Sequence, residues 1–172
     1  MTNLDQLKDR IPDFARDLRI NLGVIGSSTA LTPQQAWTIA LASAVTTRNR
    51  AVIDAVEGDA AAQLEAGAIT AAKSAAAIMG MNNVYYRFQH FMPEASEYGA
   101  MPARLRMQVI GNPGIDKLDF ELACLAASAI TGCEACVRSH EKAVRERGGT
   151  KEMVQDAVRI AAVLNGVAVS LA

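Results

Sequence analysis

Residues 121–140 read ELACLAASAITGCEACVRSH, an apolar, Ala-rich segment followed by a glycine and a more polar segment. Alanine and leucine favour the α-helix intrinsically, and the apolar segment lacks the alternation typical of a strand. Gly132 is the residue type that most often ends a helix, because glycine readily adopts the left-handed conformation of the closing turn. We therefore expect a buried helix, a break at Gly132, and a second helix with Cys133 in its first turn.

The same Ala-rich, helical composition extends along the chain, and no segment shows sustained strand alternation. The sequence therefore predicts an all-α fold. Thr32 followed by Pro33 is typical of a helix start, with a capping residue and a proline at the first helical position. Further helices are expected at these positions: 33–47, 49–65, 67–90, 101–111, 116–131, 133–147 and 150–170.

The N-terminal region carries an amphipathic pattern, with apolar residues three or four apart. They are Leu4, Leu7, Ile11, Phe14, Leu18 and Leu22. We expect Pro12 to split this stripe into two short helices, because proline lacks an N–H donor and clashes with the preceding turn. The Gly-, Ser- and Thr-rich residues 23–31 are predicted to form a loop.

The chain of 172 residues is predicted to form a single domain, residues 1–172, assembled from two similar helical halves. Shifted by 85 residues, Ala42–Thr46 lies over Ala127–Thr131. An internal repeat relating residues 33–87 to 118–172 is one interpretation, and chance matching of Ala-rich helices is the other. In this register Glu121, Cys133, Cys136 and His140 lie opposite Ala36, Arg48, Ala51 and Ala55, so only the second half would carry chemistry.

Composition and charge narrow the class of protein. Half of the residues are apolar, the formal net charge is −1, and no dense basic run is present, which argues against binding to nucleic acid. Residues 1–10 are polar, unlike a signal peptide, and the apolar tract 160–172 is shorter than the ~20 residues that span a bilayer. We expect a cytoplasmic protein that does not enter a membrane.

Two cysteines and a histidine lie on one face of the second helix of the opening stretch. Cys133, Cys136 and His140 occupy positions i, i+3 and i+7, which lie on the same side of an α-helix. Thiolates are the reactive form of cysteine, and a histidine one turn after Cys136 can accept its proton. A sulfenic acid on one cysteine can then condense with the other to give a reversible disulfide. This arrangement favours thiol redox chemistry.

Glu121 lies on the preceding helix, and antiparallel packing of the two helices could bring its carboxylate to the imidazole of His140. A carboxylate there would orient the ring and raise its basicity. The alternative is a structural zinc site formed by Cys133, Cys136 and His140. Structural zinc requires four ligands, and only Cys124 and His90 remain as further cysteine or histidine ligands.

Other polar and aromatic residues receive structural interpretations. Cys124 is expected in the packed core, and His90 at the C-terminal end of a helix. Asn82 and Asn83 interrupt an apolar helix and are expected to make structural hydrogen bonds. The aromatic residues that follow are predicted to pack or to form an interface rather than to line a pocket: Tyr85, Tyr86, Phe88 and Phe91.

The segment AITGCEACVRSH (residues 129–140), with Glu121 twelve residues before the first motif cysteine, resembles the active site of the alkyl hydroperoxidase D family. That family belongs to the carboxymuconolactone decarboxylase-like superfamily. Three further segments resemble it: 46–49 (TTRN), 76–87 (AAIMGMNNVYYR) and 112–115 (NPGI). The resemblance covers nearly the whole chain, and it implies an all-helical antioxidant enzyme, a thiol peroxidase of the alkyl hydroperoxide reductase type.

The resemblance implies a role for each motif residue. Cys136 would be the thiol that reacts with the hydroperoxide and becomes a sulfenic acid, and Cys133 its proton donor and disulfide partner. His140 would act as the general base, with Glu121 orienting it in a proton relay. Members of the family may carry a histidine between the two cysteines, where this chain has Ala135, so proton transfer from that position is absent here.

The resemblance also implies partners. Dihydrolipoamide on a lipoyl-bearing acyltransferase would be the electron donor, with no tightly bound cofactor and no metal, and a peroxiredoxin would be regenerated. A homotrimer is implied as well. Two alternatives remain: a protein disulfide reductase for a peroxiredoxin with weak peroxidase activity, and a non-catalytic helical domain binding metal. A lactone decarboxylase of the same superfamily is disfavoured, because that reaction needs no dithiol.

Overall fold

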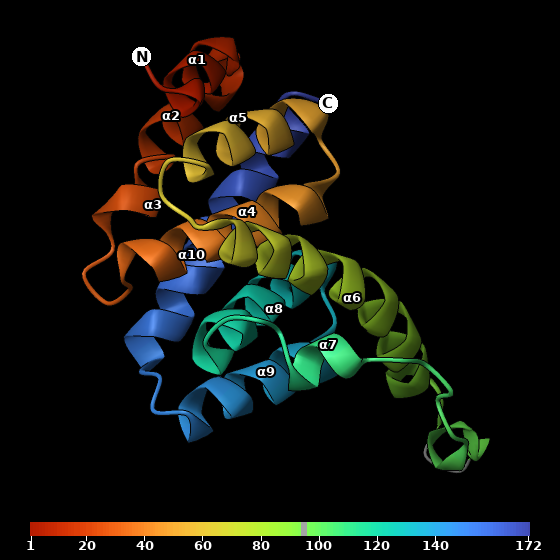
Figure 1. Cartoon of the computed structure of the whole chain (residues 1–172). Coiled ribbons are helices and arrows are strands. Elements are labelled where there is room, and N and C mark those ends of the chain that lie inside the picture. Colours follow the sequence, from red (N-terminus) through yellow and green to blue (C-terminus); the bar gives the residue numbers. More distant parts are fainter. Residues whose placement is uncertain (94–95) are drawn as a thin grey trace.

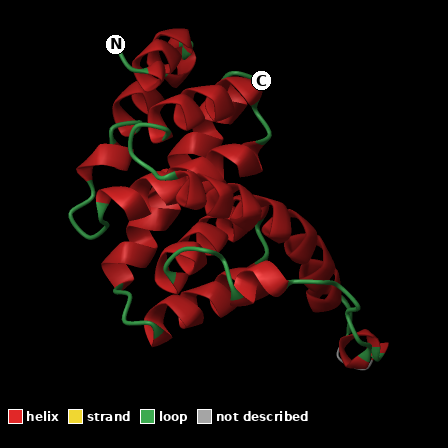
Figure 2. Cartoon of the chain, viewed as in Figure 1, coloured by secondary structure: helices red, strands yellow, loops and turns green. Residues whose placement is uncertain are grey.

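The computed structural model describes residues 1–93 and 96–172. Helices joined by loops make up this part of the chain, and no strand occurs in it (Figure 2). The predicted all-α class is confirmed. The helices pack around a core rich in alanine, leucine and isoleucine, which the Ala-rich composition allows to be close-packed with short distances between helices.

The N-terminal region forms two short helices, as the position of Pro12 predicts. Helix α1 (Asn3–Arg10) starts at a capping box between Thr2 and Asp5, and the chain turns at Ile11 and Pro12 into a 3-10 turn, η1 (Asp13–Ala15). Helix α2 (Asp17–Asn21) follows. The predicted loop at 23–31 is partly wrong: residues Val24–Ser27 form a short helix, α3. Ile25 is buried in the core, and this burial stabilises a helical turn in a polar segment.

In the described residues, the body of the molecule is formed by the longer helices, in the order α4 (Pro33–Thr47), α5 (Arg50–Ala60), α6 (Ala66–Phe91), α8 (Lys117–Thr131), α9 (Glu134–Glu146) and α10 (Lys151–Ser170). The predicted helices at these positions are confirmed, with the ends of 33–47 unchanged and the other ends shifted by at most five residues. Thr32 and Thr150 cap α4 and α10, each by accepting a hydrogen bond from a backbone N–H of the first turn. Helices α4, α6, α8 and α10 pack against one another, and α9 lies across α8 and α6 (Figure 1).

The predicted helix at 101–111 is wrong over most of its length. After η3 (Tyr98–Ala100) the chain is non-helical to Met107, and only α7 (Gln108–Gly111) is helical. None of residues 101–107 is buried, and Arg104 has a φ of 52°. A short amphipathic segment gains little from forming a helix when it lies outside the core, because packing supplies most helical stability. Figure 1 shows η3 beyond the end of α6, away from the bundle, and the chain after it running back to α7 next to α9.

Helix α10 has 20 residues and is apolar enough to meet the length and composition criterion for a membrane span. It is longer than the apolar tract 160–172 considered from the sequence. The core helix of a soluble protein meets the same criterion, and the buried side chains of α10 pack against α4 and α8.

Each half of the described chain contains three longer helices in succession: α4, α5 and α6 in the first half, and α8, α9 and α10 in the second. The first helix of each set, α4 or α8, has 15 residues. Both end at a residue in the left-handed conformation, Arg48 (φ 61°) and Gly132 (φ 69°). These positions are 84 residues apart (132 − 48), one fewer than the register of the sequence comparison, so Asn49 lies opposite Cys133. A duplication remains a prediction.

Candidate active site

The turn between α8 and α9 positions the two motif cysteines. Gly132 ends α8 with a φ of 69°, and the N–H of Cys133 donates to the carbonyl of Ser128 at 3.2 Å. This geometry confirms the helix break predicted at Gly132. Cys133 is the N-cap of α9 rather than a residue of its first turn, because the hydrogen bond to Ser128 holds it in an extended conformation.

The sulfurs of Cys133 and Cys136 are paired as a disulfide, with their Cα atoms 5.3 Å apart. Cys133 is completely buried, whereas Cys136 is slightly exposed and lines a pocket. Within residues 1–93 and 96–172, no cluster of three or more His, Cys, Asp or Glu side chains is arranged to hold a metal ion. In this form Cys136 is the sulfur of the pair that a molecule in the pocket meets.

His140 and Glu121 meet across the contact between α8 and α9. Oε2 of Glu121 lies 2.7 Å from Nδ1 of His140, and both side chains are buried. The other ring nitrogen, Nε2, lies 3.1 Å from Sδ of Met79 on α6. A thioether can accept but not donate, so this second contact is a hydrogen bond when Nε2 carries a proton. The carboxylate contact orients the ring, and the Met79 side chain packs against its other edge.

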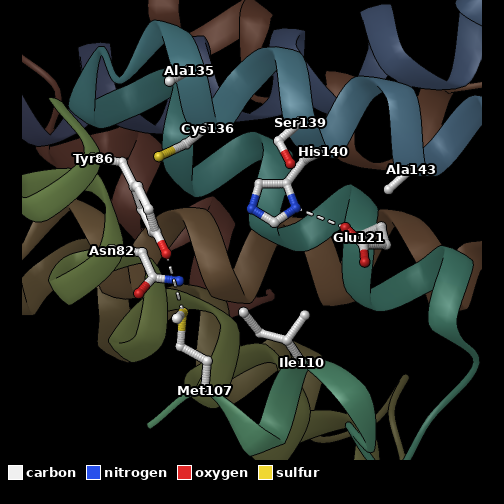
Figure 3. A pocket seen from close by; sticks show the side chains of 10 residues that line it. All are labelled: Asn82, Tyr86, Met107, Ile110, Glu121, Ala135, Cys136, Ser139, His140 and Ala143. Carbon is white, nitrogen blue, oxygen red and sulfur yellow. Dashed lines mark hydrogen bonds and ion pairs between the residues drawn. The ribbon is translucent and has the colours of Figure 1, made fainter. Parts of the chain in front are cut away.

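A pocket of about 300 Å³ opens beside Cys136 and His140 (Figure 3). Its walls come from α6, α7, α8 and α9, and they are mostly apolar with a few polar groups. The lining residues are Asn82, Tyr86, Met107, Ile110, Glu121, Ala135, Cys136, Ser139, His140 and Ala143. The pocket therefore brings three of the four predicted site residues to one space, while Cys133 lies behind Cys136.

Two polar pocket residues received a structural interpretation from the sequence alone. Tyr86 was expected to pack, but it lines the pocket, and its hydroxyl lies 4.0 Å from Sδ of Met107. Asn82 was expected to make a structural hydrogen bond, but its Oδ1 has no hydrogen-bond partner among the protein groups described. The spacing of four residues places both side chains on one face of α6, which is the signal that could have linked them.

Asn83 behaves as predicted. Its Nδ2 donates to Oγ1 of Thr131 at 2.6 Å, and its Oδ1 accepts from Oγ of Ser128 at 3.1 Å. Arg87, one turn further along α6, donates to the backbone carbonyl of Thr131 at 2.6 Å. These bonds tie α6 to the last turn of α8, immediately before the two motif cysteines.

The remaining cysteine and histidine lie outside the pocket. Cys124 is completely buried, as predicted, and burial raises the pKa of its thiol well above the ordinary value of 9.0, with the charge of Glu121 raising it further. His90 is in the last turn of α6, where its Nε2 lies 3.3 Å from Oε2 of Glu134. Glu134 also pairs with Arg138 at 2.7 Å on the exposed side of α9. Phe88 and Phe91 are exposed beyond the pocket.

Comparisons with known proteins identify the family. Residues 96–172 match the carboxymuconolactone decarboxylase family. The alkyl hydroperoxide reductase AhpD of Bradyrhizobium sp. (strain ORS 278) is 54% identical over 169 residues, which cover 98% of this chain and 93% of the relative. The chain belongs to the AhpD family. AhpD proteins of Brucella anthropi and Streptomyces griseus subsp. griseus are each 51% identical over 98% of this chain and 96% and 94% of their own length.

Membership of the AhpD family confirms the resemblance found in the sequence. It also confirms that the chain is an enzyme, an oxidoreductase of the alkyl hydroperoxide reductase type.

Proposed function

We propose that this AhpD-family protein reduces organic hydroperoxides through a dithiol–disulfide cycle of Cys136 and Cys133. The observation that supports the proposal is the pairing of the two sulfurs with Cys136 alone of the pair facing a pocket that His140 also lines. A reactive sulfur at the pocket and a resolving sulfur behind it are the arrangement that a sulfenic acid needs in order to be trapped before further oxidation.

In the proposed oxidative half-reaction, His140 takes the proton of the Cys136 thiol. The Cys136 thiolate attacks the terminal oxygen of the hydroperoxide, the O–O bond breaks, and the alkoxide takes the proton of Cys133 to leave as the alcohol. The Cys133 thiolate then attacks the sulfenic sulfur of Cys136 and displaces hydroxide, which takes the proton from His140 and leaves as water. Two thiols are oxidised to a disulfide, and the hydroperoxide is reduced by two electrons.

Glu121 acts on these reaction steps through His140. Its carboxylate accepts a hydrogen bond from Nδ1–H, so that the other nitrogen, Nε2, is the one that exchanges protons in the pocket. The negative charge also stabilises the imidazolium that exists while the thiolate attacks. Ala135 contributes no proton, and the pair of His140 and Glu121 is the proton-transfer group that the pocket provides.

For the reductive half-reaction we propose a dihydrolipoamide-bearing protein, such as a lipoyl-bearing acyltransferase, as electron donor. Cys136 is only 5% exposed, so a dithiol carried on a flexible chain reaches it more readily than a cysteine on a flat protein surface. By the same argument, regeneration of a partner peroxiredoxin requires that partner to present an extended segment. A dithiol that is reduced again in every cycle suits the cytoplasm. A homotrimer is also proposed, on the resemblance to the family.

A protein disulfide reductase for a peroxiredoxin, with weak direct peroxidase activity, is the second candidate. It uses the same two sulfurs, but a peroxiredoxin disulfide, rather than a hydroperoxide, would oxidise them. The two functions therefore differ in which oxidant acts faster on the reduced enzyme.

The experiment is a single-turnover reaction of the reduced protein with tert-butyl hydroperoxide, followed by trapping and mass spectrometry. We expect a Cys133–Cys136 disulfide in the wild type, and a dimedone-labelled sulfenic acid on Cys136 in Cys133→Ser. The matched control, Cys124→Ser, should form the disulfide at the wild-type rate. A sulfenic acid on another residue, or no oxidation of a fully reduced wild type, would contradict the proposal.

A further inference from the structure

Asn82 is a polar side chain of the pocket wall that takes no part in the proposed dithiol cycle. It is only 4% exposed, and its Oδ1 makes no hydrogen bond with any protein group in the described part of the chain. A buried carbonyl oxygen without a partner costs about 1–3 kcal/mol, and most such groups in proteins are satisfied. An amide kept in this state in the wall of a pocket has the properties of a group that binds a ligand.

The neighbouring asparagine shows that the fold satisfies buried amides where they serve structure. Asn83 is buried to a similar extent on α6, and both ends of its amide are hydrogen-bonded to α8. Asn82 lies one position earlier on the helix and so points in another direction, towards the pocket. Asn83 is therefore an amide with a structural role, whereas the Asn82 amide makes no hydrogen bond with a described protein group and can be used by a ligand.

Figure 3 shows the Asn82 amide bordering the same space as the sulfur of Cys136 and the hydroxyl of Tyr86. Of these groups, the Tyr86 hydroxyl already has Sδ of Met107 within 4.0 Å as a weak acceptor. Oδ1 of Asn82 is fully buried without a partner, whereas Nδ2 is not fully buried and makes no hydrogen bond with a protein group in the described residues. The Nδ2 group is therefore the polar group of the α6 wall that is free to act on a molecule next to Cys136.

The N–H group of a carboxamide can bind the peroxy group of a hydroperoxide. The inner oxygen of the peroxy group is an acceptor, and an amide N–H donates to it. When the Cys136 thiolate attacks the terminal oxygen and the O–O bond breaks, negative charge develops on the inner oxygen. A hydrogen bond from a fixed N–H donor to that oxygen is stronger in the transition state than in the ground state, as in an oxyanion hole.

We propose that Asn82 is the hydroperoxide-binding residue of this enzyme: its Nδ2 donates a hydrogen bond to the inner oxygen that becomes the alkoxide. The bond between Cys136 and the terminal oxygen forms as the O–O bond breaks, and Cys133 supplies the proton that completes the alcohol. A dithiol donor has no peroxy group, so Asn82 acts in the oxidation of the enzyme and not in its reduction. This inference rests on the proposed function.

The test measures the two half-reactions separately in Asn82→Leu, which keeps the volume of the side chain and removes both polar atoms. Oxidation of the reduced enzyme by tert-butyl hydroperoxide is followed by rapid quenching and thiol titration. Reduction of the disulfide enzyme by dihydrolipoamide is followed in the same way. We expect the oxidation rate constant to fall by about 100-fold, as on loss of an oxyanion-hole donor, and the reduction rate constant to stay within about twofold of the wild type.

The stability of the variants distinguishes binding from a structural role. Because Oδ1 of Asn82 makes no protein hydrogen bond, Asn82→Leu should unfold at a temperature equal to or above that of the wild type. The control, Asn83→Leu, breaks two hydrogen bonds and should unfold at a lower temperature. An unchanged oxidation rate in Asn82→Leu would overturn the assignment, as would an equal fall in both half-reactions with loss of stability. A wild type that hydroperoxide does not oxidise would contradict the proposed function itself, and the assignment with it.

Discussion

Oε2 of Glu121 lies 2.7 Å from Nδ1 of His140, and the contact joins two helices, α8 and α9, whose connecting turn carries Cys133. A buried carboxylate and a buried imidazole at this distance stabilise each other only as a pair, because either one alone would leave a polar group without its partner. The pair therefore orients the proton-transfer group of the pocket and helps to hold α9 against α8.

Replacement of Glu121 by Gln tests the relay. Gln keeps the size of the side chain and an oxygen that can accept from Nδ1–H, but it lacks the charge that stabilises the imidazolium. We expect the rate of hydroperoxide reduction to fall by about 10- to 100-fold, at the lower end of what a general base contributes, with the fold retained. Steady-state kinetics and circular dichroism measure the two effects. Glu146→Gln replaces an exposed carboxylate on α9, the helix of His140, and should leave both unchanged. Wild-type kinetics in Glu121→Gln would remove Glu121 from the relay.

The left-handed conformation of Gly132 can be tested by a pair of glycine replacements. A Cβ at Gly132 would meet no atom within 4 Å, so Gly132→Ala introduces only the strain of a positive φ, about 1–2 kcal/mol of destabilisation. A Cβ at Gly80, inside α6, also meets no atom within 4 Å, and Gly80→Ala should stabilise by about 0.5–1 kcal/mol. Urea denaturation measures the free energy of unfolding of both variants. Stabilisation in Gly132→Ala or destabilisation in Gly80→Ala would contradict the assignment of these effects to backbone conformation.

Asp59 of α5 fastens α1 to the body, because its carboxylate accepts hydrogen bonds from the backbone N–H of Asn3 at 2.8 Å and of Leu4 at 2.9 Å. Burial alone would raise the pKa of Asp59, but these hydrogen bonds outweigh it and lower the pKa below 3.8. A carboxylate with a lowered pKa in the folded state contributes stability above its unfolded pKa and loses it as the pH falls through the folded value.

Asp59→Asn should therefore cost about 1 kcal/mol of the free energy of unfolding at pH 7, similar to the loss of a side-chain acceptor at a helix N-terminus, and less at pH 3. Urea denaturation of wild type and variant at both pH values measures the difference. Asp54→Asn, an exposed residue of the same helix paired with Arg50, should show almost no effect at either pH. A cost that is the same at pH 3 and pH 7 would show that the charge of Asp59 does not act as described.

Cys124 provides a prediction about reactivity. The thiolate is the reactive form of cysteine, and Cys124 is completely buried with a pKa raised by burial. Iodoacetamide should label Cys136 in the reduced native protein and leave Cys124 unmodified between pH 7 and pH 9. Mass spectrometry of the peptides detects both sites, and urea should make Cys124 reactive. Labelling of Cys124 in the native protein at the rate of Cys136 would contradict its place in the core.

The parts of this molecule that the sequence predicts are those with local causes. The cap at Thr32 and the break at Gly132 depend on a few neighbouring residues, and they are found where the sequence predicts them. The helix predicted at 101–111 fails because the pattern of apolar residues cannot show whether a core lies next to them. The same is true of residues 24–27, whose helix depends on the burial of Ile25.

In the candidate site, too, residues that are close in sequence could be predicted from spacing, and residues brought together by packing could not. Cys133, Cys136 and His140 lie within eight residues of one another, so spacing alone places them together. The contact of Glu121 with His140 was an expectation that required the packing of two helices. Asn82 and Met107 come from other parts of the chain, and only the assembled pocket shows that they border Cys136.

Steady-state consumption of tert-butyl hydroperoxide with dihydrolipoamide as electron donor tests the dithiol cycle most directly. The wild type is compared with Cys136→Ser, Cys133→Ser and the control Cys124→Ser. We predict turnover in the wild type and in Cys124→Ser, and none above background in either variant of the pair. Turnover retained in Cys136→Ser, or an inactive wild type with both thiols titratable, would contradict the proposal that these two cysteines carry the reaction.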